Sequence, residues 1–266
     1  MTRSSDRVTA AVRGWLEEPR SGPLVLGLCG SQGSGKSTLA GDLKTRMEAQ
    51  GRRAAILSLD DLYLGRAARV ELARDVHPLF ATRGVPGTHD AAHGAALLDA
   101  VGAGEPVIMP RFDKARDEPA NAGEAVPGSL DLLIFEGWCV GARPQQADAL
   151  AVPVNALERD EDPDGIWRSH VNALLHGPYA HLNARIDRLV LLAAPGFEVV
   201  RGWRGQQEDA LRASTTDAQT RVMDETALDR FVQHYERLTR YILAEMPGRA
   251  DLVLRLAPDR SLRDIP

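Results

Sequence analysis

The stretch GSQGSGKS, from Gly30 to Ser37, matches the pattern G-x-x-x-x-G-K-[ST] at every fixed position. It follows a short apolar run and precedes residues 37–50, where we expect a helix, and this strand–loop–helix context is what the pattern requires. Glycines let backbone N–H groups converge on phosphate oxygens, and a helix N-terminus adds a partial positive charge. The stretch therefore predicts a loop that binds the phosphates of a nucleoside triphosphate.

The residues of this loop have expected places around ATP and Mg²⁺. Lys36 reaches the β- and γ-phosphates, and the Ser37 hydroxyl is a ligand for Mg²⁺. The alternative, a chance Gly/Ser-rich turn, is disfavoured because strand, motif and helix occur in register. The residues expected to hold the nucleotide are Gly30, Ser31, Gln32, Gly33, Ser34, Gly35, Lys36, Ser37 and Thr38.

Five short apolar runs predict the strands of one sheet. They are Leu24–Cys29, Ala54–Leu59, Leu130–Phe135, Arg188–Ala193 and Asp251–Leu256. Near-continuous apolar runs suit parallel strands that are buried on both faces. Because segments with helical periodicity lie between them, the sequence predicts an α/β fold, a three-layer sandwich with a central parallel sheet.

Two segments show helical periodicity most clearly. Near the N-terminus the apolar residues of one face are Val8, Val12, Trp15 and Leu16. Residues 226–245 carry a longer apolar stripe, and Thr226 with Asp229 predicts a capping box at its start.

Composition excludes several classes of protein. The chain has 266 residues, 44% hydrophobic and 26% charged, with a net charge of −5. This acidic balance gives no footprint for a nucleic-acid partner. No secretory signal and no run of 18 apolar residues is present, so we expect no membrane contact. The two cysteines, Cys29 and Cys139, adjoin apolar runs, which predicts buried thiols in a reducing compartment, the cytoplasm.

Three carboxylates follow two of the predicted strands. Asp60 and Asp61 follow the apolar residues at the start of AILSLDDLYL (residues 55–64), and Glu136 follows those of DLLIFEGW (residues 131–138). A turn or helix cap is the ordinary interpretation of an Asp pair. In open parallel sheets, however, ligands bind beyond the carboxyl ends of the strands, on the rim where the phosphate-binding loop also lies. We therefore expect Asp60 to be a catalytic base, and Asp61 and Glu136 to serve the metal.

Cations are also needed around a transferred phosphoryl group. Arg201 and Arg204 are three residues apart after the fourth strand, so on a helix they face the same way. We expect them on a lid helix over the phosphates, where they join Lys36 as catalytic cations. The alternative is a solvated helix face, with Glu198 and Glu208 as ion-pair partners.

Two long irregular stretches, residues 76–90 and 111–129, lie between the second and third strands. Loops of this length are more often functional than idle. The residues expected to contact an acceptor substrate are Arg83, His89, Arg111 and Lys114. Arginine offers a bidentate fork to a carboxylate, which favours a small anionic acceptor.

The motif set GSQGSGKST, SLDDLYL, RGVPGTHD, PRFDK, FEGWCVG and WRGQQE resembles the P-loop D-glycerate 3-kinases of plants and fungi. These are relatives of uridine kinase, phosphoribulokinase and pantothenate kinase. The resemblance runs from about residue 24 nearly to the C-terminus. One departure is Leu62, which stands where the family usually has an aromatic residue.

The resemblance implies Mg²⁺-dependent transfer of the γ-phosphate of ATP to a hydroxyl of D-glycerate, which gives 3-phosphoglycerate. It implies the strand order 2-3-1-4-5 and a single kinase domain over residues 1–266. Within this domain we expect an N-terminal helix in residues 1–22, acceptor-binding loops in residues 76–129 and a lid in residues 196–215. It also implies that Asp60 is the base, Glu136 the metal-side carboxylate, and Arg201 and Arg204 the lid arginines.

Other readings remain open at this point. A regulatory GTPase would carry Asn-Lys-x-Asp, and a transport ATPase Leu-Ser-Gly-Gly-Gln; the sequence has neither. A kinase acting on another small acceptor (a nucleoside, pantothenate or a sugar) and a non-catalytic ATP-binding module stay as alternatives. Oligomeric state has no signal in the sequence.

Overall fold

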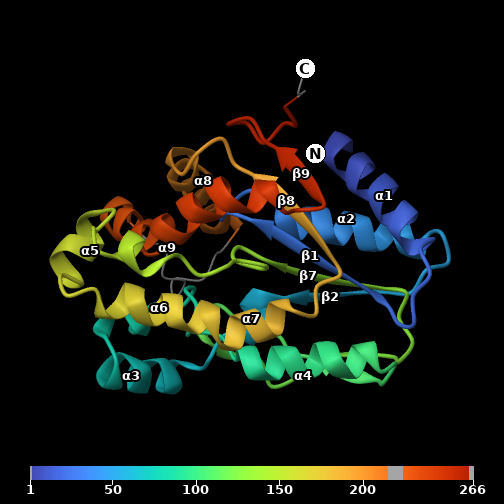
Figure 1. The fold of residues 1–266 in the computed structure, drawn as a ribbon, viewed down its shortest axis with the longest axis horizontal. Helices are drawn as coiled ribbons and strands as arrows, with labels where there is room; N and C mark the ends of the chain where they lie inside the picture. The colour runs from blue at the N-terminus through green and yellow to red at the C-terminus, as the bar shows by residue number, and fades with distance from the viewer. Residues whose placement is uncertain (1, 215–223, 264–266) are drawn as a thin grey trace.

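The computed structural model describes residues 2–214 and 224–263. Five parallel strands form the central sheet: β1 (Leu24–Gly30), β2 (Ala54–Ser58), β7 (Leu132–Gly137), β8 (Arg188–Ala193) and β9 (Leu252–Arg255). Their spatial order is β2-β7-β1-β8-β9, as Figure 1 shows. The predicted order 2-3-1-4-5 is therefore confirmed, and so is the α/β class.

β1 lies in the middle of this sheet and every one of its residues is buried. It pairs with β7 in the register Leu24↔Leu132 and with β8 in the register Leu26↔Arg188. Burial on both faces explains why its sequence is almost uninterrupted in apolar residues.

Helices cover both faces of the sheet (Figure 1). On one face α1 (Thr2–Leu16) and α2 (Lys36–Glu48) pack with Leu24, Leu26 and Leu28 of β1. The helices of the other face share a core with Val25 and Cys29; they are α4 (Ala91–Gly102), α6 (Ile166–His176), α7 (Pro178–Asn183) and α9 (Glu225–Glu245). Alternate residues of β1 thus belong to the two cores, as the pleat of a strand requires.

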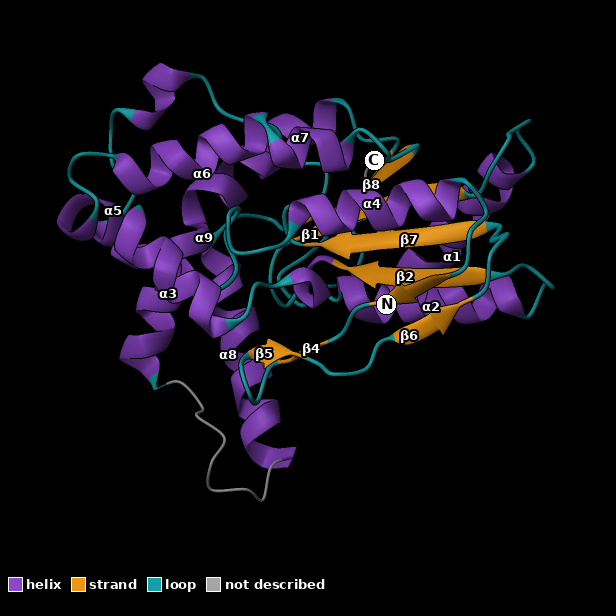
Figure 2. Ribbon diagram, turned by 90° about the horizontal axis from the view of Figure 1, so that it is seen from below, coloured by secondary structure: helices purple, strands orange, loops and turns teal. Residues whose placement is uncertain are grey.

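Shorter elements surround this frame. Three more helices are α3 (Arg66–Asp75), α5 (Ala156–Glu161) and α8 (Glu198–Ser214), and four 3₁₀ turns are Leu59–Leu62, Pro78–Ala81, Ala147–Leu150 and Met246–Gly248. Two antiparallel pairs join β3 (Val107–Met109) to β6 (Glu124–Val126) and β4 (Phe112–Asp113) to β5 (Glu118–Pro119). Figure 2 shows β4 and β5 on the side toward which the arrowheads of β2 and β7 point.

The boundaries correct several expectations. The N-terminal helix ends at Leu16, and residues 76–129 contain α4 and four short strands in addition to loops. The predicted capping box of the last long helix is wrong. Asp224 is its N-cap and accepts a hydrogen bond from the Ala227 N–H, while Asp229 pairs with Arg201. The expected lid corresponds to α8, and residue 215 lies outside the described residues.

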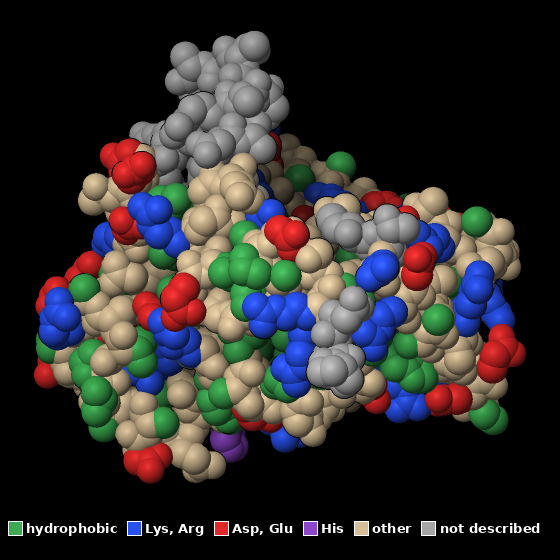
Figure 3. Space-filling view, turned by 90° about the horizontal axis from the view of Figure 1, so that it is seen from above, with side chains coloured by type: hydrophobic (Ala, Val, Ile, Leu, Met, Phe, Trp, Pro, Cys, Tyr) green, Lys and Arg blue, Asp and Glu red, His purple; other side chains and the backbone are tan. Residues whose placement is uncertain are grey.

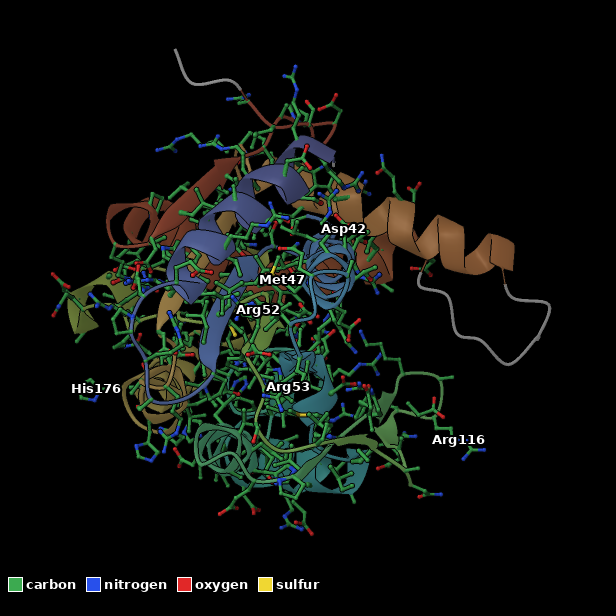
Figure 4. The ribbon with its side chains drawn as sticks, turned by 90° about the vertical axis from the view of Figure 1, so that its right-hand side faces the viewer. Asp42, Met47, Arg52, Arg53, Arg116 and His176 are labelled. Carbon is green, nitrogen blue, oxygen red and sulfur yellow. The ribbon has the colours of Figure 1, made fainter. Side chains whose placement is uncertain are left out.

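Three further features concern the helices and the charged surface. Within the described ranges, no helix has both the length and the apolar character needed to cross a membrane. Figure 3 shows acidic and basic side chains intermixed over much of one face, with several basic side chains near its middle. In Figure 4, Met47 and Arg52 lie beside α1, where the first two helices pack together.

Candidate active site

The phosphate-binding loop connects β1 to α2 and depends on glycine at two positions with positive φ. Gly33 has φ 74° and Gly35, the N-cap of α2, has φ 89°. Left-handed backbone is favoured by glycine, and it turns the N–H groups of the loop toward one point. A Cβ on Gly33 would also lie 2.6 Å from Cβ of Trp203, so α8 packs directly on the loop.

Glu136 lies within hydrogen-bonding distance of this loop, deep in the rim. Its Oε1 accepts hydrogen bonds from the Ser37 and Ser58 hydroxyls, each at 2.9 Å. The side chain is 3% exposed, and Oε2 is buried without a hydrogen-bond partner among the described residues. A buried carboxylate oxygen beside a serine hydroxyl is the donor set that Mg²⁺ prefers, so these residues fit the metal.

Asp60 stands in the 3₁₀ turn that follows β2. Its Oδ2 accepts from Lys114 Nζ at 2.6 Å, and its Oδ1 accepts from the Tyr63 hydroxyl at 2.8 Å. Burial by itself would raise the pKa of Asp60, but the charges of Lys114 and Lys36 lower it well below the ordinary value. Asp60 is therefore ionised at neutral pH, which a proton acceptor requires.

Asp61 makes different contacts from its neighbour. Its Oδ1 accepts from the backbone N–H of Phe112 at 3.0 Å, and its Oδ2 accepts from Arg111 Nη1 at 3.1 Å. Burial, the largest influence, raises the pKa of this carboxyl. Both oxygens thus hold the start of the β4–β5 hairpin. Both Asp61 oxygens have protein partners in this arrangement, and the expected metal contact of Asp61 stays a prediction.

His89 is buried behind Asp60. Its ring stacks on Tyr63 with centroids 4.6 Å apart, and Nδ1 lies 2.6 Å from the Tyr179 hydroxyl. Burial lowers the pKa of His89 to about 4, against the opposing charge of Asp60. His89 is therefore neutral at pH 7; its ring packs on Tyr63 and its Nδ1 contacts Tyr179.

The segment that carries Arg83 is fastened from two sides. The Tyr235 hydroxyl donates to the Arg83 carbonyl at 3.0 Å, and Trp138 Nε1 donates to the Gly84 carbonyl at 2.7 Å. Gly84 has φ 132°, and a Cβ there would lie 1.9 Å from the Tyr235 hydroxyl oxygen. Only glycine fits this position. The Arg83 guanidinium lies 5.7 Å from the centre of the Phe112 ring, close to the Asp60 turn.

Four of the five remaining expected cations contact other protein side chains. Arg111 pairs with Asp61 and Glu124, and Lys114 with Asp60. Arg201 pairs with Asp229, and the Arg204 guanidinium lies 5.6 Å from the centre of the Phe231 ring. Both lid arginines therefore contact α9. Lys36 is half-buried and makes no ion pair with any described residue.

Sequence reasoning missed several residues of this site. Tyr63 contacts both Asp60 and His89, so it supplies the aromatic ring expected at Leu62, whose own side chain is in the core. Trp203 and Arg260 meet at the phosphate-binding loop: the Arg260 guanidinium lies 5.2 Å from the centre of the Trp203 ring and donates to the Gly33 carbonyl. Tyr63 was detectable within SLDDLYL. Trp203 and Arg260 are 57 positions apart, and no local pattern connects them.

Comparison with known proteins identifies the family. No family model matches the sequence. The chain is 36% identical over 248 residues to "Uncharacterized kinase mug58" of Schizosaccharomyces pombe, covering 88% of this chain and 86% of that protein. It is 30% identical over 256 residues to "D-glycerate 3-kinase, chloroplastic" of Arabidopsis thaliana, covering 90% of this chain and 52% of the plant protein. The chain belongs to this P-loop kinase family.

The kinase thus spans about half the length of its plant relative. Solved structures share its fold. D-glycerate 3-kinase from Cryptococcus neoformans gives a TM-score of 0.78 at 24% identity, with 98% of both chains covered. The YGR205w protein gives 0.77 at 23% identity, with 98% of this chain and 95% of that chain covered. The enzyme is a phosphotransferase with a hydroxyl acceptor, and the predicted family is confirmed.

Proposed function

We propose that this kinase transfers the γ-phosphate of ATP to a hydroxyl of D-glycerate, in the presence of Mg²⁺, and forms 3-phosphoglycerate. The observation that carries the proposal is the position of Asp60, an ionised carboxylate held by Lys114 on the rim of the phosphate-binding loop. The name of the Arabidopsis relative, a D-glycerate 3-kinase, supports glycerate as the acceptor.

Asp60 acts as the base in this proposal. Each of its oxygens accepts one hydrogen bond, from Lys114 or Tyr63, and retains a lone pair for the acceptor hydroxyl. As the hydroxyl oxygen bonds to the γ-phosphorus, its proton passes to Asp60 and the bond to the β–γ bridging oxygen breaks, which releases ADP. Lys36 and the backbone of residues 30–38 hold the phosphates, and Arg201 and Arg204 act from the lid helix.

Ser37 and Glu136 would hold Mg²⁺, which supplies charge neutralisation at the β- and γ-phosphates when bound. The unpaired Oε2 of buried Glu136 supports this assignment. We propose that Asp61 instead positions the hairpin start through Arg111 and Phe112.

The charged side chains of the acceptor region favour an acceptor substrate that carries a single carboxylate. The four expected contacts are Arg83, His89, Arg111 and Lys114. His89 is neutral, Lys114 faces Asp60, and Arg111 has two acidic partners. Arg83 retains N–H groups without a partner among the described residues, so it is the best fork for the acceptor carboxylate. An acceptor that carries its own phosphate would call for more open cations than these.

We also propose that the enzyme works in a reducing compartment, the cytoplasm. Cys29 and Cys139 are free and buried, and burial raises the pKa of both thiols, to about 12 for Cys29. Such thiols are unreactive in the reduced protein.

An acceptor screen tests the proposed function. The purified enzyme is incubated with MgATP and, separately, D-glycerate, L-glycerate, glycerol, uridine, pantothenate or fructose. ADP release and the ³¹P NMR spectrum of the product are recorded. We expect 3-phosphoglycerate from D-glycerate and much slower turnover of the others. Faster turnover of a nucleoside, pantothenate or a sugar would show that this compound, and not D-glycerate, is the acceptor. ATP binding without acceptor-dependent ADP release would show that the protein is a non-catalytic ATP-binding module.

A further inference from the structure

Asp117 joins two arginines of the acceptor region. It lies in the turn between β4 and β5 with φ 62°. Its Oδ2 accepts from Arg69 Nη2 at 2.5 Å, and its Oδ1 pairs with Arg83 Nη1. Burial would raise the pKa of Asp117, but the two arginines lower it, so the carboxylate is ionised. None of the expectations from sequence gave this residue a role.

Arg69 fixes one end of this arrangement. It lies on α3 and is only 2% exposed. Its Nε donates to the Leu64 carbonyl at 3.2 Å and its Nη1 to the Ala81 carbonyl at 2.8 Å. Asp117 is its only carboxylate partner among the described residues. Leaving a buried guanidinium without its counter-charge is strongly destabilising, so Asp117 stays with Arg69 when substrate binds.

Arg83 is the free end. Only its Nη1 is used by Asp117, and among the described residues the rest of the guanidinium has no hydrogen-bond partner. The side chain is 30% exposed and lies over Phe112, whose ring packs edge-on against Tyr63 at 5.3 Å between centroids. Tyr63 in turn donates a hydrogen bond to Asp60. The rings of Phe112 and Tyr63 therefore lie between the Arg83 guanidinium and the proposed base.

We propose that Asp117 is a positioning residue that holds Arg83 in the orientation needed to bind the carboxylate of the acceptor. The link Arg69–Asp117–Arg83 begins at Leu64, four residues after Asp60, and therefore fixes the separation between the base and the cation that binds the carboxylate. A fixed separation selects hydroxy acids in which hydroxyl and carboxylate are the matching distance apart. This inference rests on the proposed function.

The opposite role is also conceivable for an anion beside Arg83. Asp117 could occupy the cation in the absence of substrate and compete with the acceptor. Its bond to buried Arg69 argues against competition, because a competing carboxylate has to leave. The two roles predict opposite changes in the KM for the acceptor. Loss of a positioning residue raises this KM, and loss of a competitor lowers it.

Asp117→Asn separates these roles with little disturbance of the backbone, because asparagine tolerates left-handed φ as aspartate does. We expect the KM for D-glycerate to rise roughly tenfold or more, with kcat and the KM for ATP each within about threefold of the unmodified enzyme. Arg83→Ala should give the same pattern. The double variant should be no worse than Arg83→Ala alone, because Asp117 acts through Arg83.

Two matched controls lie on the same hairpin. Glu118→Gln removes a neighbouring carboxylate whose Oε1 accepts from the Arg66 N–H, and Arg116→Ala removes an arginine that points away from the body of the protein in Figure 4. Both should leave the KM for D-glycerate within about twofold. Should Asp117→Asn not fold, Arg69→Gln tests the same link, because it releases the anchor and keeps the Asp117–Arg83 pair; the same rise in KM is expected.

One outcome would overturn this inference and leave the proposed function standing. In that outcome the unmodified enzyme phosphorylates D-glycerate, but Asp117→Asn, or Arg69→Gln in its place, leaves the KM for D-glycerate unchanged or lowers it. Effects of Asp117→Asn and Arg83→Ala that add in the double variant would also overturn it. Absence of any D-glycerate turnover by the unmodified enzyme would overturn the proposed function, and this inference with it.

Discussion

Lys114 Nζ lies 2.6 Å from Asp60 Oδ2, although the two residues are 54 positions apart in the chain. Asp60 comes from the turn after β2, and Lys114 from the connection between β4 and β5. The ammonium group keeps the carboxylate ionised and marks the place where the hairpin meets the sheet rim. In the proposed reaction, an acceptor hydroxyl bound here would meet a base that is already deprotonated.

Replacing Lys114 should change the pH dependence of the kinase. The charge of Lys114 lowers the pKa of Asp60 against the effect of burial. In Lys114→Met the pKa of Asp60 therefore rises, a larger fraction of the base is protonated at a given acidic pH, and the acid limb of kcat/KM moves to higher pH. Measurement of kcat/KM from pH 4 to pH 8 in both enzymes tests this. An acid limb that stays in place would show that Asp60 does not titrate in the reaction.

Lys36→Ala should abolish phosphoryl transfer and leave the fold intact. Lys36 makes no ion pair with the described residues, so its removal costs little packing or charge pairing. Lys44→Ala, eight residues further along α2 and paired with Glu48 and Glu124, is the control and should retain activity. Turnover and thermal denaturation of both variants are the measurements. Near-normal turnover of Lys36→Ala would exclude residues 30–38 as the active phosphate-binding loop.

Glu136→Gln should raise the Mg²⁺ concentration needed for half-maximal activity. The substitution keeps the shape of the side chain but removes the negative charge of a carboxylate whose Oε2 is buried without a hydrogen-bond partner among the described residues. Loss of an outer-shell partner costs roughly 10–100-fold in metal affinity, and loss of a direct ligand should cost at least as much. Mn²⁺ binding followed by electron paramagnetic resonance gives a readout independent of turnover. Ser58→Ala, which removes one hydrogen bond to Oε1, should have a smaller effect. Equal Mn²⁺ affinity in Glu136→Gln and the unmodified protein would contradict the metal assignment.

Gly84→Ala should destabilise the protein and weaken acceptor binding. The new Cβ would overlap the Tyr235 hydroxyl, and alanine is strained at φ 132°. We expect a loss of about 1–3 kcal/mol in the free energy of unfolding, together with a higher KM for the acceptor. Gly102→Ala in α4 has open space around the added methyl group and should be neutral or stabilising. Chemical denaturation of the two variants compares them directly; equal stability would show that the Arg83 segment is not held as described.

The sheet was predictable because its signals are local. Each strand is a continuous apolar run and the phosphate-binding loop is a contiguous motif, so the five strands could be inferred from the sequence alone. Their order was expected only from the family resemblance, and the structure confirms it. Boundaries shifted where polar residues belong to strands: β7 extends through Glu136 to Gly137 because Glu136 is buried and paired in register with Ser58 and Leu28.

The site was less predictable because its contacts join distant segments. Asp61 was expected to serve the metal because it adjoins Asp60, and its hydrogen-bond partners, which lie 50 and 51 positions away, could not be inferred from the local sequence. Asp117 resembles any loop aspartate until the fold brings Arg69 and Arg83 to it. Arg201 and Arg204 were expected on one helix, which is correct, but only the structure reveals that both contact α9.

The most direct test of the account is the turnover of Asp60→Asn with MgATP and D-glycerate. The asparagine keeps the size of the side chain and loses the base. We predict that kcat falls by roughly 10²–10⁴-fold, the usual contribution of general-base catalysis, while ATP affinity stays near that of the unmodified enzyme. An Asp60→Asn enzyme that keeps most of its turnover would contradict the account, and loss of activity in Asp61→Asn instead would reverse the roles of the two aspartates.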